Sequence, residues 1–215
     1  MFRPLVLALA LVAAGAGAAA AQTPWTDPGS TFSMTLPKGW GKPDKMSSSS
    51  PTVSEYAAGN ANEECIVYRF DRPETAVATP MQLKNAWAAP LGATKWAELT
   101  AKMLWSDGAP KVTEDKVETV GAWPVQTAVV SGKNGPVVAA LHARPGSEIW
   151  VFCQSYDGKD RAAAFRATAN SVTTTKDAEF AAAEAAEAAK AAEAKAAADA
   201  AAAAPAAEKD KKKRK

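Results

Sequence analysis

A run of four candidate β-strands, separated only by tight turns, leaves few folds open to the second half of this chain. The connections contain Gly121, Asn134-Gly135 and Pro145-Gly146, and such residues are favoured in tight turns. Strands joined this closely pair with their neighbours as an antiparallel meander. They are expected at residues 111–120, 123–132, 136–145 and 147–156.

Three strands and a helical segment are expected before this run, and one helix after it. Phe32, Met34 and Leu36 alternate with polar residues, as in a strand with one buried face. From residue 81 the apolar spacing changes to about 3.6, which predicts helix. The expected strands are 31–37, 52–58 and 63–70, the helices are 81–105 (interrupted at 90–92) and 159–172, and a mobile surface loop is expected at 41–51. Strands grouped before and after helices predict an α+β fold with a mainly antiparallel sheet flanked by helices.

The first 21 residues have the order of features of a secretory signal peptide. Arg3 provides a basic start, an apolar run extends from Leu5 to Val12, and small residues end at Ala21. We expect cleavage before Gln22, and the apolar run is too short to span a membrane. The sequence therefore predicts an exported protein, periplasmic or secreted, without an integral membrane span.

The C-terminal part of the chain differs from the rest in composition. Residues 22–175 have the length of one globular domain, whereas residues 176–205 are mostly Ala with Glu and Lys, which predicts a solvated helical spacer that ends at Pro205. Residues 206–215 are expected to be a disordered basic tail. Its unbroken basic run is either a solvated terminus or an electrostatic contact to an anionic envelope surface. That run consists of Lys211, Lys212, Lys213, Arg214 and Lys215.

The charge balance excludes nucleic acid as a partner, and the cysteine content predicts a disulfide. Residues 1–175 contain 16 Lys and Arg against 15 Asp and Glu, so the domain lacks the basic field of a nucleic-acid-binding protein. Two cysteines in an exported chain favour a disulfide between Cys65 and Cys153, and two buried free thiols are the alternative.

Most tryptophans are expected to fill the core. These are Trp40, Trp87, Trp96, Trp105, Trp123 and Trp150.

Several segments resemble the PsbP-like fold family. They are the opening TFSMTLPKGW, the helical segment in the middle of the chain, the strand GAWPVQTAVV and the closing IWVFCQSYDGKDRAAAFRATANSV. The family includes the extrinsic photosystem II protein PsbP, exported bacterial relatives of unknown role and a Ran-binding nuclear import factor. The resemblance spans residues 29–173. It implies an α/β/α sandwich that serves as an accessory or binding module rather than an enzyme.

Common catalytic and metal-binding patterns are missing from the sequence. There is no Gly-rich phosphate loop, no nucleophile elbow and no histidine pair, because His142 is the single histidine. His142 shares a strand face with Arg144 and is expected at an exposed or rim position. We therefore predict no catalytic, cofactor or metal residue. An enzyme with an unconventional site is an alternative, with Glu64, Asp71 and Cys65 as the first suspects.

These observations favour a non-enzymatic exported accessory or binding protein. We expect it to be a monomer without a cofactor that contacts an unknown envelope protein or an anionic envelope surface through the loop at 41–51 and the tail. Two alternatives stay open: an unrecognised periplasmic enzyme, and a structural spacer or tether in the cell envelope.

Overall fold

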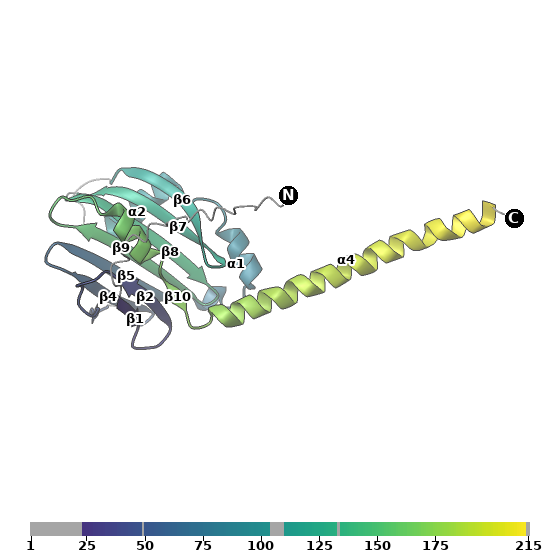
Figure 1. Ribbon diagram of the computed structural model, residues 1–215, viewed down its shortest axis with the longest axis horizontal. Helices are drawn as coiled ribbons and strands as arrows, with labels where there is room; N and C mark the ends of the chain where they lie inside the picture. The colour runs from purple at the N-terminus through teal and green to yellow at the C-terminus, as the bar shows by residue number, and fades with distance from the viewer. Residues whose placement is uncertain (1–22, 49, 104–109, 133, 214–215) are drawn as a thin grey trace, which may run out of the picture.

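The computed structural model, shown in Figure 1, describes residues 23–48, 50–103, 110–132 and 134–213. The predicted signal peptide at 1–21, the cleavage site at Gln22 and the basic residues Arg214 and Lys215 lie outside the described residues. Within the described ranges the fold is α+β with antiparallel sheets, which confirms the predicted fold class.

The centre of the domain is a seven-stranded sheet in which all neighbouring strands are antiparallel. Four strands that follow one another in the chain also lie side by side, with Gly121 (φ 59°) and Gly146 (φ 80°) in two of the tight turns. The predicted meander is therefore confirmed. In sheet order the strands are β3 (Asp44–Lys45), β4 (Val53–Asn60), β5 (Glu63–Asp71), β9 (Ser147–Ser155), β8 (Gly135–Arg144), β7 (Trp123–Gly132) and β6 (Val112–Val120).

A smaller sheet has the order β1 (Thr23–Thr26), β2 (Phe32–Leu36), β10 (Thr173–Thr174). The sequence predicted β2 but neither β1 nor β10. Both form because β2 offers backbone hydrogen bonds along its two edges, which a local pattern does not reveal. The loop expected at 41–51 is ordered in part for the same reason, since β3 pairs with β4.

The helices of the domain begin and end at local signals. A capping box between Thr79 and Gln82 starts α1, and Gly92, at φ 94°, precedes α2, so the predicted interruption is confirmed. The last helix of the domain is shorter than the predicted 159–172. Their bounds are η1 (Pro73–Thr75), α1 (Pro80–Ala86), α2 (Ala93–Met103) and α3 (Ala162–Ala169).

The large sheet carries a core on each face. On one face, Phe32 of β2 and Phe165 of α3 pack over the sheet and are fully buried. On the other face, Trp96 of α2 is fully buried against the sheet with Leu141 and Phe152. The domain is therefore layered, with α3 and the smaller sheet on one side of the large sheet and α2 on the other.

The tryptophans fill these cores to different extents. Trp96 donates its Nε1–H to Asp115 Oδ1 at 2.9 Å, which satisfies its buried donor. Trp25, which was not among the tryptophans expected in the core, is also buried. Trp105 lies outside the described residues. Buried are Trp25, Trp40, Trp96 and Trp123; half-buried are Trp87 and Trp150.

The helix α4 (Asp177–Lys213) projects from the domain as a single long arm (Figure 1). We predicted that it ends at Pro205, and this was wrong, because the helix continues through that position to Lys213. The Ala-rich sequence on both sides has the highest helix propensity of any composition, which offsets the cost of about 3 kcal/mol for an interior proline. None of the described helices is both long enough and apolar enough to cross a lipid bilayer.

Candidate functional site

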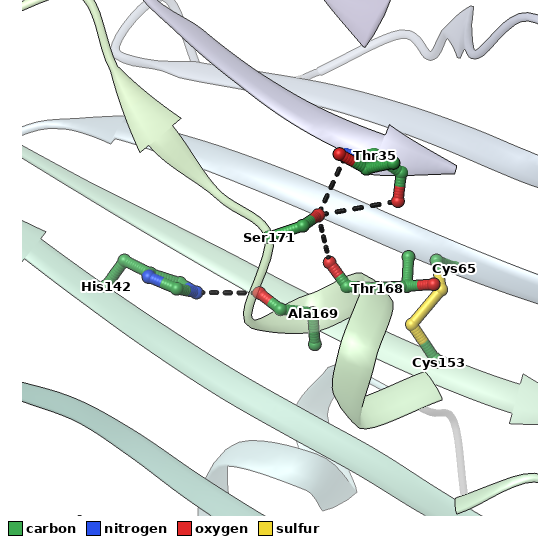
Figure 2. Close-up of a disulfide and its surroundings, with 7 residues drawn as sticks. All are labelled: Thr35, Cys65, His142, Cys153, Thr168, Ala169 and Ser171. Carbon is green, nitrogen blue, oxygen red and sulfur yellow. Dashed lines mark hydrogen bonds between the residues drawn. A yellow bond between two sulfur atoms is a disulfide. The ribbon is translucent and has the colours of Figure 1, made fainter. Parts of the chain in front are cut away.

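The structure joins Cys65 of β5 and Cys153 of β9 in a disulfide (Figure 2). The two residues face each other in the strand register, with their Cα atoms 4.0 Å apart, and both are fully buried. They lie beneath α3, which Ser171 ties to β2 by accepting the backbone N–H of Thr35 at 2.8 Å. Both cysteine sulfurs are therefore bonded, and Cys65 offers no thiolate to the enzyme alternative.

His142 is fully buried, so the exposed or rim position expected for it was wrong. Its Nε2 lies 2.8 Å from the backbone oxygen of Ala169, at the end of α3 (Figure 2). Burial lowers the pKa of His142 to about 4, which keeps the ring neutral and lets Nε2 donate to this carbonyl. The strand pattern could not show that the end of α3 covers this position.

The carboxylates suspected in the enzyme alternative are not brought together. In the strand register, Glu64 lies opposite Gln154 near one end of β5, whereas Asp71 lies opposite Ser147 at the other end. Glu64 accepts a hydrogen bond from the Tyr156 hydroxyl, and Asp71 forms an ion pair with Arg69 at 2.5 Å. No group of three potential metal ligands occurs in the part of the chain that the structure describes.

The base of α4 is held by a cluster that we call the helix anchor: Trp123, Arg144, Asp177, Phe180, and the pair Lys84 and Glu184. Its centre is the Arg144 guanidinium, of which only 2% is exposed. Arg144 Nε donates to Asp177 Oδ1 at 2.6 Å and Nη2 to Oδ2 at 3.3 Å, and this two-point contact fixes the orientation of both side chains. The guanidinium lies 4.3 Å from the centroid of the Trp123 ring, which adds a cation–π contact.

Asp177 connects the anchor to the first turn of α4. It accepts hydrogen bonds from the backbone N–H of Thr174 at 3.0 Å and from the Thr174 hydroxyl at 2.7 Å. Burial would raise the pKa of Asp177, but the hydrogen bonds from Arg144 and Thr174 outweigh it and lower that pKa. A carboxylate in the first helical turn also interacts favourably with the helix dipole.

Two further contacts hold the next turns of the helix against the domain. Phe180 packs edge-on against Trp123, with their ring centroids 5.7 Å apart. Lys84 of α1 forms an ion pair with Glu184 and places its ammonium 5.0 Å from the Trp123 ring. The base of α4 is thus packed rather than solvated, which corrects our expectation of a solvated spacer for this part of the tail. Phe180, the only large apolar residue of the tail, was the sequence signal for this packing.

Beyond the anchor, the part of α4 whose side chains the structure describes is exposed from residue 188 to residue 201. Lys195 forms an ion pair with Asp199 at 2.6 Å, one helical turn away. The 37 residues of α4 correspond to about 55 Å. The helix therefore carries Lys211, Lys212 and Lys213 to the end of the molecule farthest from the domain (Figure 1).

A hollow of about 300 Å³ lies beside the first strand of the domain. Pro24, Trp25, Leu36 and Trp40 supply most of its apolar wall, and Lys42 is the only charged residue among those that line it. One cation and an apolar wall provide no acid, base or nucleophile pair for catalysis. The hollow also adjoins Thr23, close to the predicted cleavage site.

Comparison with known proteins supports the fold. No protein-family model and no curated protein matches the sequence. A crystal structure from Bacteroides thetaiotaomicron VPI-5482 has a TM-score of 0.37 and 10% identity, covering 72% of this chain and 49% of that chain. The solution structure of cyanobacterial PsbP (CyanoP) from Synechocystis sp. PCC 6803 has a TM-score of 0.51 and 16% identity, covering 76% of this chain and 98% of that chain. The chain therefore has a PsbP-like fold, as the resemblance predicted.

Proposed function

We propose that this protein is an exported, non-enzymatic accessory protein whose helical arm sets the distance between the PsbP-like domain and an anionic surface of the cell envelope. The observation that carries this proposal is the helix anchor. A terminus that was only solvated would not need a buried guanidinium bonded at two points to its first turn. The anchor gives α4 a defined direction. The arm therefore holds the domain at a defined distance instead of connecting it flexibly.

Export is the second part of the proposal. Residues 1–21 have the features of a cleavable signal, and the Cys65–Cys153 disulfide is typical of an oxidising compartment. The basic run then lies where it would meet the phosphates of envelope lipids. Each Lys or Arg near an anionic membrane contributes about 1 kcal/mol, so the five cations of residues 211–215 together are enough for salt-sensitive binding.

Vesicle flotation tests the contact to an anionic surface. The mature chain, residues 22–215, is mixed at low ionic strength with vesicles containing phosphatidylglycerol or with vesicles of phosphatidylcholine alone. We expect binding to the anionic vesicles only, weakening as salt is added. A matched variant with residues 211–215 all changed to Gln keeps the arm and loses the charge, so it should stay unbound. Equal binding of the variant, or no binding of the mature chain, overturns the proposed contact.

The length of the arm is tested separately. Removing 11 residues, 188–198, deletes about three turns from the exposed stretch and keeps the anchor and the basic run. We expect vesicle binding to persist, while energy transfer from the domain tryptophans to a dansyl lipid increases. Replacing the same residues with Gly and Ser, which removes rigidity, should give a broad range of transfer efficiencies. If neither change alters the transfer, the arm does not set the distance.

A further inference from the structure

The part of the large sheet formed by β4, β5 and β9 has an outward face that the helices do not bury. Trp96 of α2 packs over β7, β8 and Phe152 of β9, and α1 lies against the end of β8. Next to Phe152, the side chains of Tyr68, Phe70 and Trp150 are only half-buried. Three large aromatic rings therefore stay accessible on the same side of the sheet as α2.

Carboxylates alternate with these rings along the strands. In the register, Glu55 lies opposite Tyr68, and Glu148 lies opposite Phe70 and two residues before Trp150. Glu64 belongs to the same face of β5, because it is four residues from Tyr68. All three glutamates are half-buried. We call this surface the acidic aromatic face, and it consists of Glu55, Glu64, Tyr68, Phe70, Glu148 and Trp150.

One position of this face already holds a cation from the same chain. Arg72 places its guanidinium 5.0 Å from the Phe70 ring centroid and donates from Nη2 to Glu148 Oε2 at 3.0 Å. Trp150 Nε1 donates to the same carboxylate at 3.1 Å. Ring and carboxylate thus bind a guanidinium together, by a cation–π contact on one side and a charge-assisted hydrogen bond on the other.

The rest of the face repeats this chemistry without a cation. Among the described residues, neither Glu55 nor Glu64 forms an ion pair; Tyr68 lies opposite Glu55, and the Tyr156 hydroxyl donates to Glu64. Burial, and then the negative charges of Glu55 and Glu64, raise the pKa of Tyr68 to about 12. An anionic membrane or polymer would be repelled here.

We propose that the acidic aromatic face docks a Lys- and Arg-rich extended segment of a partner polypeptide. The basic side chains of that segment lie across Tyr68 and Trp150 and reach Glu55 and Glu64, as Arg72 already does with Phe70 and Glu148. Their aliphatic stems cover the exposed ring surfaces. This surface is distinct from the basic end of α4, so the domain and the arm bind partners of opposite charge.

Peptide titration followed by NMR tests the docking. The mature chain, labelled with ¹⁵N, is titrated at low salt with an acetylated octapeptide in which Lys and Arg alternate with Ser, which places the cations on one side of a strand. We expect saturable shifts of backbone amides in β4, β5 and β9. The same peptide with Gln in place of Lys and Arg should cause none.

Two matched variants decide whether the face itself is responsible. Glu55→Gln with Glu64→Gln should weaken peptide binding about fivefold or more, since two charge contacts to the peptide are lost. Glu98→Gln with Glu193→Gln changes the net charge equally at exposed positions away from the face and should leave the affinity unchanged. Equal weakening by both pairs, shifts located elsewhere, or no saturable binding overturns the proposal. The vesicle experiment depends on residues 211–215 and can fail or succeed independently.

Discussion

His142 and Arg144 are two residues apart on β8, yet burial affects their charges in opposite ways. His142 is fully buried with its Nε2 against the carbonyl of Ala169, and burial keeps its ring neutral. Around the buried Arg144 guanidinium, Asp177 and the Trp123 ring replace the water that burial removes. The same strand face thus contains the buried neutral ring of His142 and the buried guanidinium of Arg144, which contacts both Asp177 and Trp123.

The neutral state of His142 predicts a dependence of stability on pH. Its folded pKa of about 4 lies below the unfolded value of 6.5, so the unfolded chain binds a proton that the folded chain does not. The free energy of unfolding should therefore fall by about 3 kcal/mol as the pH drops from 6.5 to 4. Urea denaturation across this range measures it. His142→Gln still has a donor for the Ala169 carbonyl but has no group that titrates, so its free energy of unfolding should fall less over this pH range. An equal fall for the variant and the wild-type protein would contradict the prediction.

At the scale of elements, two connections hold parts of the chain that local sequence does not relate. The disulfide links β5 to β9 across 88 residues, and the anchor links β8 and α1 to the base of α4. The first restrains the centre of the sheet, and the second determines where the long helix leaves the domain.

Removing the disulfide should cost a large part of the stability. Closing a loop of 88 residues restricts the unfolded chain, and its loss corresponds to about 4 kcal/mol. We expect Cys65→Ala with Cys153→Ala to lower the free energy of unfolding by about this amount in urea denaturation. The reduced wild-type protein is the control and should be destabilised similarly. A change below about 1 kcal/mol would show that the closed loop adds little.

Loosening the anchor should free the arm without unfolding the sheet. Arg144→Gln leaves the partly exposed Asp177 without its charged hydrogen-bond donor, at a cost of about 2 kcal/mol. Electron–electron distance measurements between nitroxides at Asp44→Cys and Ala197→Cys report the direction of the arm, and the bonded native cysteines stay unlabelled. We expect a narrow distribution for the wild-type anchor and a broad one with Arg144→Gln. Lys195→Gln, beyond the anchor, is the control and should leave it narrow.

At the scale of the whole molecule, the chain combines a disulfide-linked PsbP-like domain with a long helical arm. The acidic aromatic face lies on the domain, whereas Lys211, Lys212 and Lys213 lie in the last turn of α4, a helix about 55 Å long.

Export and disulfide formation should be visible in the intact mass of the protein recovered from outside the cytoplasm. We expect a chain that starts at Gln22 and is about 2 Da lighter than its fully reduced form, because one disulfide removes two hydrogens. Changing the small residue Ala21 to Pro should block cleavage and leave the precursor in the cells. A full-length, reduced chain in the soluble cytoplasm would contradict the prediction.

The sequence alone determined the features that depend on neighbouring residues. Alternating apolar residues and turn glycines specified the meander of β6 to β9, and Ala content specified α4, because backbone geometry and helix propensity are local properties. The disulfide between Cys65 and Cys153 was predicted from the presence of two cysteines in a chain expected to be exported.

Only the tertiary structure determined which edge strands form and which elements bury which residues. β1, β3 and β10 exist because neighbouring strands offer unpaired backbone groups at their edges. His142 is buried because the end of α3 lies over it, and the base of α4 is packed because Trp123 at the start of β7 and Arg144 at the end of β8 lie at the same end of the sheet. Such contacts join residues that are far apart in the chain, and their energies arise from burial and charge pairing that no local pattern encodes.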